Sequence, residues 1–287
     1  MTYGWAILII AVVLGVLFQL GVFNAANFAP KATAGACQVM RPNGPGRTGF
    51  VNLVCVCNGE LPEFVAVLTP NTELSLNVPS PFDVPNLQSA TLTFWYKQLT
   101  TTGCWPGIVG FGSFATGYCS YDCFRIYTCT SSGRIYLGGA AINGTGNSPA
   151  YPPFPMINLN QWYFVTMVFN GALTSNNLQA YINGQLLGGT DLSGTIPFAL
   201  SEGFQIGYSG EGINSQIANI QFYNTSLSQP EVQTLYTEGI GGAPINVNNL
   251  VSWWPLNGNG NDYSGNNYGL PAGLTYTSAW TSGYTPP

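Results

Sequence analysis

The leading stretch of this chain limits its fold more than any other feature, because it is apolar and carries no charge. Residues Gly4–Phe23 contain no Asp, Glu, Lys or Arg, and the first charged residue of the chain is Lys31. An apolar run of about 20 residues forms a helix long enough to cross a bilayer. A helix that is apolar on every side must be buried, either in lipid or against protein. We therefore expect a long helix over residues 1–28, which ends before Pro30.

Three roles are open to such a helix: a cleaved signal peptide, a membrane anchor, or a helix that packs against its own copies in a filament core. A signal peptide has a basic segment and a shorter apolar core, whereas no Lys or Arg precedes this run. Hydropathy does not separate the other two roles, because lipid and protein both bury the helix. The buried side chains would be those of Tyr3, Trp5, Ile7, Leu8, Ile10, Val13, Leu14, Leu17, Phe18, Leu20 and Phe23.

The opening MTYGWAILIIAVVLGVLFQLGVF resembles the N-terminal segment of archaeal type IV pilin-like proteins. The family's basic leader and its glutamate near the mature N-terminus do not precede Met1 in this sequence. The resemblance implies that the helices bundle into the core of an extracellular cell-surface filament, with membrane insertion before assembly. It also implies that the chain's main partner is another copy of itself, and that the remaining residues form the outside of the filament and serve adhesion.

Charged residues make up 6% of the chain, where a soluble globular domain has about 25%. Surface charge normally keeps a domain dispersed, so this chain needs glycans or burial in an assembly. Two N-glycosylation acceptors, Asn143-Gly-Thr and Asn224-Thr-Ser, are consistent with glycans. The net charge is −5 and no basic cluster is present, which excludes nucleic acid as a partner.

The seven cysteines all lie in the first half of the chain and indicate disulfides in an oxidising compartment. A zinc site is disfavoured, because the chain has no His and the cysteine spacings match no strong zinc template. We expect local pairs among the last four cysteines, a bond from Cys37 to Cys55 or Cys57, and one cysteine left free or bonded between chains. The connectivity stays open. The cysteines are Cys37, Cys55, Cys57, Cys104, Cys119, Cys123 and Cys129.

Beyond the helix we expect a connecting region at residues 29–71, rich in Gly, Pro and Cys, and a two-sheet β-sandwich at residues 72–287. Short apolar runs separated by Gly-rich and Asn-rich turns favour a sandwich, and Asn183-Gly184 is typical of a tight hairpin turn. The run Ser228–Tyr236 is the one later helix, with Ser228 and Glu231 as a capping box and Gly239 at its end. Strands are expected at Val51–Cys57, Phe64–Leu68, Thr91–Tyr96, Ile108–Phe111, Phe124–Tyr127, Arg134–Leu137, Trp162–Phe169, Leu178–Ile182, Phe204–Gly207 and Ile217–Tyr223.

Four segments together resemble the laminin-G-like, concanavalin A-like jelly roll: Leu92–Tyr96, Gln161–Thr166, Gln179–Gly184 and Ile217–Tyr236. The resemblance implies a mainly β fold and, for carbohydrate-binding relatives, a role in binding glycans. A membrane-anchored lectin is therefore the alternative to the filament subunit.

The piece that usually opens this family, a Trp-containing strand followed by a loop of Asn, Asp, Ser and Gly, stands here at the C-terminal end. It runs from Leu250 to Gly269. We expect it to fold back as a circularly permuted strand of the same sandwich, because short connections within one domain are the rule. The alternative is that Val251–Trp280 adds a strand to a neighbouring subunit.

The sequence argues against catalysis. Without His, the Ser/His and Cys/His arrangements cannot form. A sugar-cleaving member of the fold needs two carboxylates on one sheet face, and no alternating run contains such a pair. Glu60 and Glu63 stand beside a turn and a proline, and Glu202 and Glu211 stand in Gly-rich and Ser-rich loops. We expect a protein that is not an enzyme.

Two further features have competing interpretations. One loop could supply oxygens to a weak calcium site from Asp262, Asn259 and Asn261, with Asn257 and Asn266 flanking them. The same residues are what tight turns require, and we expect the turn, with no cofactor required. Loop aromatics could stack on sugar rings or pack on disulfides; they are Trp105, Tyr118 and Tyr121.

Overall fold

A computed structural model of the chain describes residues 37–42, 48–53, 62, 64–76, 87–111, 123–132, 134–142, 150–193, 203–207, 213–266 and 268–278. All of them belong to one compact unit, Cys37–Pro287. The helix expected at residues 1–28 lies outside the described residues. Within the described ranges, no helix has the length and apolar character that crossing a membrane requires.

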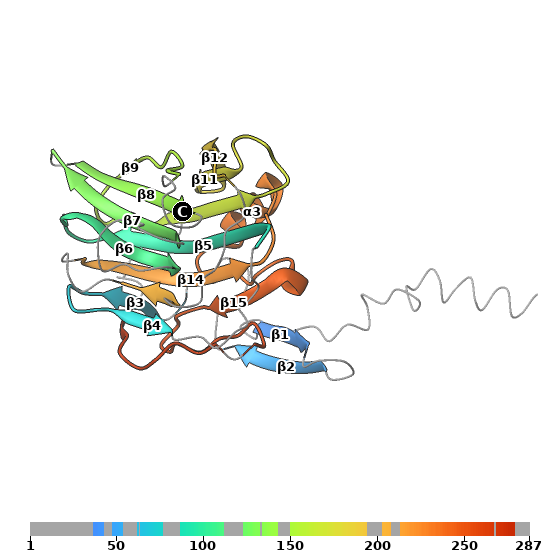
Figure 1. Cartoon of the computed structure of the whole chain (residues 1–287). Coiled ribbons are helices and arrows are strands. Elements are labelled where there is room, and N and C mark those ends of the chain that lie inside the picture. The colour runs from blue at the N-terminus through green and yellow to red at the C-terminus, as the bar shows by residue number, and fades with distance from the viewer. Residues whose placement is uncertain are drawn as a thin grey trace, which may run out of the picture. The chain divides into compact units, whose positions relative to one another are not determined.

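The structure is mainly β, and two sheets pack face to face as a sandwich (Figure 1). One sheet has eight strands in the order β12-β11-β10-β5-β14-β3-β16, with β15 also paired to β14. These strands are β3 (Phe64–Leu68), β5 (Ser89–Gln98), β10 (Tyr163–Asn170), β11 (Leu178–Ile182), β12 (Gln185–Thr190), β14 (Ser215–Tyr223), β15 (Leu250–Trp254) and β16 (Thr275–Ser278).

The other sheet has six strands in the order β4-β13-β6-β7-β8-β9. These strands are β4 (Leu74–Leu76), β6 (Cys104–Phe111), β7 (Cys123–Ser131), β8 (Arg134–Ile142), β9 (Met156–Ile157) and β13 (Phe204–Ile206). A separate hairpin is formed by β1 (Cys37–Pro42) and β2 (Thr48–Leu53). The predicted two-sheet sandwich is confirmed.

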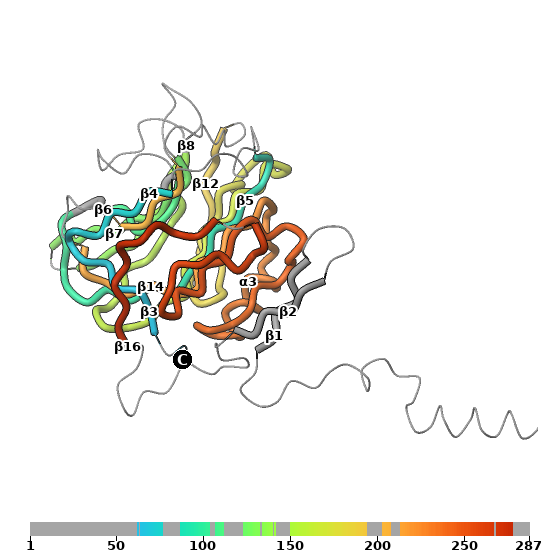
Figure 2. Tube along the Cα trace, turned by 90° about the horizontal axis from the view of Figure 1, so that it is seen from below, coloured from blue at the N-terminus to red at the C-terminus, as the bar shows by residue number. Residues whose placement is uncertain are grey.

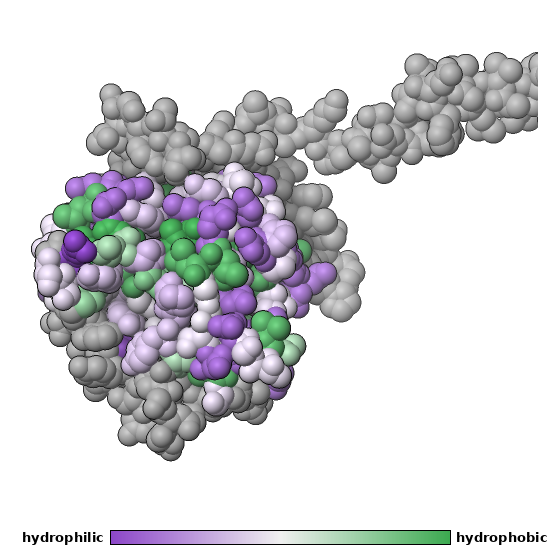
Figure 3. Space-filling model, turned by 90° about the horizontal axis from the view of Figure 1, so that it is seen from above, coloured by the Kyte–Doolittle hydropathy of each residue, from purple (hydrophilic) through white to green (hydrophobic). Residues whose placement is uncertain are grey.

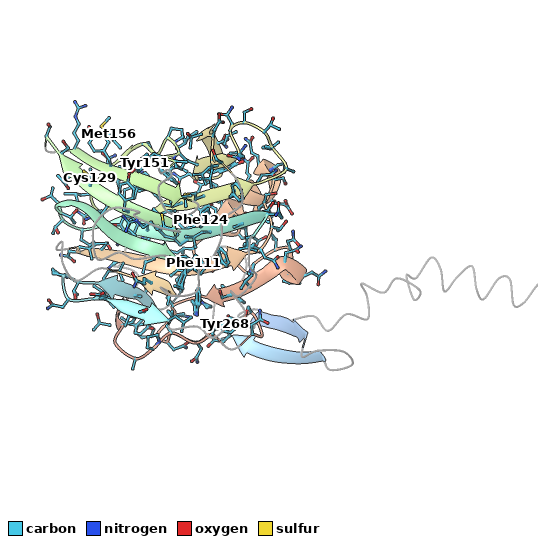
Figure 4. All side chains as sticks on the ribbon, in the orientation of Figure 1. Phe111, Phe124, Cys129, Tyr151, Met156 and Tyr268 are labelled. Carbon is cyan, nitrogen blue, oxygen red and sulfur yellow. The ribbon has the colours of Figure 1, made fainter. Side chains whose placement is uncertain are left out.

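The main core lies between the two sheets and follows from alternation along the strands, since successive side chains point to opposite faces. On β7, Phe124 and Ile126 are fully buried in this core, and Figure 4 shows Phe124 and Phe111 in the interior. Phe111 stacks edge to face on Phe204, with ring centroids 5.1 Å apart. The residues that alternate with Phe124 and Ile126 therefore face away from the interior.

A second hydrophobic cluster covers the outward face of the eight-stranded sheet. Trp95, Phe164 and Tyr181 project from β5, β10 and β11 into it, and helix α3 (Gln229–Glu238) adds Val232 and Leu235. The ring of Tyr236 stacks on Trp95 at 5.8 Å. At β5, β10 and β11 this sheet is thus buried on both faces.

The local signals for α3 and for the preceding hairpin are confirmed. The backbone N–H of Ser228 donates to the Glu231 carboxylate at 2.8 Å, as a capping box requires. Gly239 ends the helix with a φ of 81°. Between β11 and β12, Asn183 and Gly184 have φ values of 50° and 77°, the left-handed conformations of a two-residue hairpin turn.

The C-terminal segment folds back into the same sandwich, as predicted. Strand β15 pairs antiparallel with β14, and β16 pairs antiparallel with β3; Figure 2 shows β16 and β3 close together. A short 3-10 helix, Val247–Asn249, leads into β15. Because β3 also pairs with β14, the sheet already includes Phe64–Leu68, which the sequence assigned to the connecting region at 29–71. The boundary at residue 72 is therefore too late.

Asn219 joins these C-terminal elements at a bulge in β14. It is 3% exposed, and its φ of 51° is left-handed. Its side-chain oxygen accepts from Nε1 of Trp253 at 2.7 Å and from Nε2 of Gln221 at 3.0 Å. Its side-chain amide donates to the carbonyl of Gly242 at 2.8 Å, and its backbone N–H donates to the carbonyl of Pro255 at 3.1 Å. One amide side chain thus links β14, β15 and the segment after α3.

Candidate functional site

The outward face of the six-stranded sheet carries a row of polar and aromatic side chains. Arg125 and Tyr127 on β7, and Arg134 and Tyr136 on β8, alternate with core residues and so share this face. Tyr151 follows Ala150, which bridges to β8. We call these five residues the arginine–tyrosine row. Its residue types can donate hydrogen bonds and can stack against a flat ligand.

The two β7 residues of the row are buried. Arg125 is 1% exposed and Tyr127 is 8% exposed. Burial lowers the pKa of the Arg125 guanidinium, an effect that the phenols of Tyr127 and Tyr151 oppose. Burial raises the pKa of the Tyr127 phenol to about 12, and the neighbouring Arg125 charge partly offsets that rise. At neutral pH the guanidinium of Arg125 is therefore positively charged beside the neutral phenol of Tyr127.

Glycines beside the row make room for these large side chains. Tyr127 stands opposite Gly138 on β8. A Cβ at Gly138 would lie 2.2 Å from Cζ and 2.5 Å from Oη of Tyr127, so the phenol ring lies across this glycine. On the other side, Gly110 of β6 stands opposite Arg125 with a φ of 149°. Glycines thus lie beside both β7 side chains of the row.

The accessible part of the row lies toward the top of the molecule in Figure 4, where Tyr151 and Met156 are labelled. Tyr151 is 47% exposed and Met156 is 51% exposed. Arg134 is exposed, and its Nη1 lies 3.8 Å from the Met156 sulfur. Figure 3 shows apolar residues gathered within the face seen from above. On β12, which belongs to the eight-stranded sheet, the exposed apolar side chains are Leu186 and Leu187.

Two disulfide-bonded cysteines of β7 lie on either side of Arg125 and Tyr127. Cys123 and Cys129 are both disulfide-bonded. Six residues of extended strand separate their Cα atoms by about 20 Å, far beyond the 7 Å limit for a disulfide, so they do not bond to each other. Cys104 is the register partner of Cys129. The complete pairing of the seven cysteines stays a prediction, and Cys55, Cys57 and Cys119 lie outside the described residues.

The carboxylate of Asp262 organises a turn. It is 4% exposed. One oxygen accepts from the backbone N–H of Trp253 at 3.0 Å and of Ser264 at 2.9 Å. The other accepts from the Ser264 hydroxyl and from the backbone N–H of Tyr268, both at 2.9 Å.

The amide oxygens near Asp262 also accept backbone hydrogen bonds. Asn259 accepts from the backbone N–H of Asn261 at 3.0 Å, and Asn257 accepts from the backbone N–H of Phe64 at 2.8 Å. Asn266 donates to the carbonyl of Val251 at 2.8 Å. Four donors on one carboxylate favour the turn interpretation over calcium. In the described part of the chain, no three His, Cys, Asp or Glu side chains gather as metal ligands.

Most of the other residues singled out from the sequence lie outside the described part of the chain. Asn224 is exposed at the end of β14, as glycosylation requires, whereas Asn143 lies outside the described residues. No side-chain placement is described for Trp105, Tyr118 or Tyr121, nor any structure for Glu60, Glu63, Glu202 and Glu211. Described carboxylates have structural roles at Glu231, in the cap, and at Asp191, which accepts the Asn176 N–H at 2.6 Å.

Sequence reasoning missed the arginine–tyrosine row. The strands at 124–127 and 134–137 were predicted, but their outward positions were not examined as a set. The available signal was the alternation itself. Phe124 and Ile126 mark the inward positions, which leaves Arg125 and Tyr127 on the opposite face.

Comparisons with known proteins agree with this architecture. The family model of the concanavalin A-like lectin/glucanases superfamily matches residues 71–233. No curated protein sequence matches the chain. A putative carbohydrate binding protein from Bacteroides ovatus is 15% identical, with a TM-score of 0.53 over 81% of this chain and 67% of the other. A native heptameric SAP-like pentraxin from Limulus polyphemus is 18% identical, with a TM-score of 0.45 over 75% of this chain and 94% of the other.

Proposed function

We propose a function from one premise: the chain belongs to the concanavalin A-like lectin/glucanases superfamily. On that premise the sandwich binds carbohydrate on the outward face of its six-stranded sheet. One observation carries the proposal: this face presents an aromatic ring that is 47% exposed, Tyr151, together with the exposed guanidinium of Arg134. Aromatic rings stack on the apolar faces of sugars, while guanidinium and phenol groups bond their hydroxyls.

The likeness to the Bacteroides ovatus protein supports the fold of the proposed lectin. The opposite sheet is a poorer candidate, because helix α3 and the second hydrophobic cluster cover its outward face. A ligand there would have to displace packed aromatic side chains such as Trp95 and Tyr236.

A glycan array probed with the detergent-solubilised full chain tests carbohydrate binding. Tyr151→Ala should remove most of the signal, because it deletes the exposed ring. The matched control is Leu173→Ala: Leu173 is 40% exposed but lies in the turn after β10, away from the row. No glycan bound by the unaltered chain, or an equal loss in both variants, would contradict the proposal.

A second function is favoured by the uncharged run Gly4–Phe23 and by the low charge of the whole chain. We propose that the chain is a pilin-like structural subunit of an archaeal cell-surface filament. Its apolar helix enters the membrane before assembly and then packs against other copies in the core, where burial contributes about 25 cal/mol per Å² of apolar area. The sandwich, glycosylated at Asn143 and Asn224, faces outward and serves adhesion.

Electron microscopy of sheared surface material tests the filament. Leu14→Asp or Leu17→Asp should abolish filaments, because a carboxylate within a dry helix bundle is costly to bury. The control Leu173→Asp carries the same charge on an exposed turn and should leave filaments intact. Filaments that survive the helix variants would have to be held by the outer domains. A membrane-anchored lectin would appear only as detergent-extracted single molecules.

The chain is proposed to bind and not to cleave its glycan. The absence of His from the sequence and the structural roles of Glu231, Asp191 and Asp262 support this. Release of reducing ends from a bound oligosaccharide over a prolonged incubation would contradict it.

A further inference from the structure

We propose that two copies of this chain pair edge to edge through strand β12, antiparallel and about a twofold axis. Such pairing requires neither carbohydrate binding nor a filament. It uses the end of the eight-stranded sheet that lies opposite β16. Three features carry it: an open strand edge, an uncharged apolar border to that edge, and a strand sequence that complements itself.

The outer edge of β12 is open. Among the described strands, β12 pairs only with β11. Ile182 stands opposite Gln185 across the two-residue turn, and the closing pair of such a hairpin exchanges its hydrogen bonds, so the backbone N–H and C=O of Leu186 point to the outer side. Proteins protect such edges with charges, proline or bulges. Strand β12 has a bulge at Leu187 but no charge and no proline.

Apolar groups border this edge. On β12 itself, Leu186 is 41% exposed and Leu187 is 42% exposed. The segment that precedes β9 lies against β12, because a Cβ on Gly188 would come within 3.0 Å of Cγ of Pro153. This segment includes the exposed Tyr151, and Figure 1 shows β9 and β12 at the same end of the molecule. The other end of the sheet differs: among the described residues, the stretch 268–278 around β16 has no exposed large apolar side chain.

The absence of charge at this edge suits a partner of the same kind. Neither β12 nor the segment Tyr151–Ile157 contains Asp, Glu, Lys or Arg. Two copies of an uncharged surface can approach without the repulsion that like charges produce. Burial in a self-assembly also compensates for the low charge of the whole chain, in which 6% of residues are charged.

The sequence of β12 complements itself. It reads Gln-Leu-Leu-Gly-Gly-Thr. A twofold axis between Leu187 and Gly188 sets Leu186 opposite Gly189 of the second copy, and Leu187 opposite Gly188 of the second copy. Each leucine then meets a glycine, and alternating large and small residues across facing positions pack well. Asp191, one residue past the strand, falls at opposite ends of the pair, so the two carboxylates stay apart. This match favours a second copy over an unrelated strand.

Photocrosslinking of the full chain in a mild detergent tests the pairing. A benzoylphenylalanine replaces Gln185, where it would face Thr190 of the second copy. Irradiation should give a covalent dimer on a reducing gel, and its yield should rise with protein concentration. Mass spectrometry should place the link within residues 184–191. The control carries the same group in place of Val247, which is 48% exposed in the 3-10 helix before β15, and should give little dimer.

Opposite charges at one position test whether the partner is a second copy. Across the axis, Leu187 lies beside Leu187 of the second copy. Leu187→Asp alone and Leu187→Lys alone should therefore each lower the dimer yield about tenfold, because like charges meet. An equal mixture of the two variants should restore the yield, since Asp then meets Lys. Val247→Asp is the matched control and should leave the yield unchanged. Circular dichroism of each variant verifies folding.

The possible outcomes are distinct. A chain that stays monomeric at every concentration would overturn the pairing. So would a dimer that persists in Leu187→Asp, or one that the mixture of variants does not restore. Restoration requires that position 187 of one copy meets position 187 of the other, which helix-driven association does not provide. Glycan binding and filament formation can each fail without changing these results.

Discussion

The two outward faces of the sandwich carry different kinds of side chain. The eight-stranded sheet buries Trp95, Phe164 and Tyr181 beneath α3 and the segment that follows it. The six-stranded sheet carries Arg125, Tyr127 and the 47%-exposed Tyr151 on its outward face. The same alternation along strands produces both faces, so what differs is the chemistry of the outward residues: apolar on one sheet, cationic and phenolic on the other.

The difference between the two faces indicates which part of this fold can vary. The outward face of the eight-stranded sheet, here called the covered face, depends on chain that is added after β14, namely α3, β15 and the turn around Asp262. Within it the side chains of Asn219, Gln221 and Asp262 are bonded internally. The arginine–tyrosine row instead includes side chains that reach solvent, those of Tyr151 and Arg134. Stability should therefore depend mainly on the covered face, and recognition on the row.

The largest expected effect comes from Asn219, the hub of the covered face. Asn219→Leu leaves Nε1 of Trp253 and the carbonyl of Gly242 without their partners, and forces a Leu into a left-handed conformation. We expect a loss of about 3–5 kcal/mol in the free energy of unfolding, measured by urea denaturation. The control is Asn176→Leu: Asn176 has a similar φ of 49° but is exposed. A loss below about 1 kcal/mol would mean that the hub contributes little.

Next in size is Asp262, whose carboxylate fixes the turn against Trp253. Asp262→Ala should cost about 2–3 kcal/mol, because the buried N–H of Trp253 and the part-buried N–H of Tyr268 lose their acceptor. Chelation should leave the thermal midpoint of the unaltered chain unchanged, since these oxygens serve the turn. A midpoint that falls with chelator and recovers with added calcium would favour the metal interpretation instead.

Asn219 and Asp262 also show which features of the molecule can be predicted from its sequence. The Asn183-Gly184 hairpin, the capping box and most of the longer strands follow from local chemistry, so their prediction succeeded. The short strands β4 and β9 and the strands β1 and β12 were not predicted, and β2 lies at Thr48–Leu53 where Val51–Cys57 was expected. Asn219 was read as an ordinary residue of the strand Ile217–Tyr223. Its role depends on residues that approach it only after folding, and no local pattern encodes them.

The arginine–tyrosine row was missed for a related reason. Arg125 and Tyr127 were recognised as parts of a strand, but their partners come from β6, β8 and the segment after Ala150. The domain boundary was placed late because β3 reads locally as a short strand in a cysteine-rich connection. Its place in the sheet is set by β14 and β16, about 150 and 210 residues further along the chain, a separation beyond any local pattern.

A smaller effect on stability is expected at Gly138, which lies on the face with the arginine–tyrosine row. Gly138→Ala would place a methyl group against the Tyr127 ring, within 2.2 Å of Cζ before any shift. The ring must move, and we expect about 1–2 kcal/mol of destabilisation together with a severalfold loss of glycan binding. The control Gly269→Ala meets nothing closer than 3.9 Å and should change neither property. Unchanged glycan binding in Gly138→Ala would show that Tyr127 is not part of the ligand site.

The smallest effect concerns pH and again compares the faces. Burial raises the pKa of Tyr127 to about 12, above the ordinary value of 10.0, so the folded chain holds its proton where the unfolded chain releases it. This contribution to stability is complete below pH 10 and is lost as pH rises toward 12. Burial also raises the pKa of Tyr223 and of Tyr181, both on the covered face. Ultraviolet titration of the phenols should show Tyr127→Phe removing a transition near pH 12 while the covered face stays intact. If the variant instead removes a transition near pH 10, the Tyr127 phenol is in contact with solvent and the row is more open than its burial indicates.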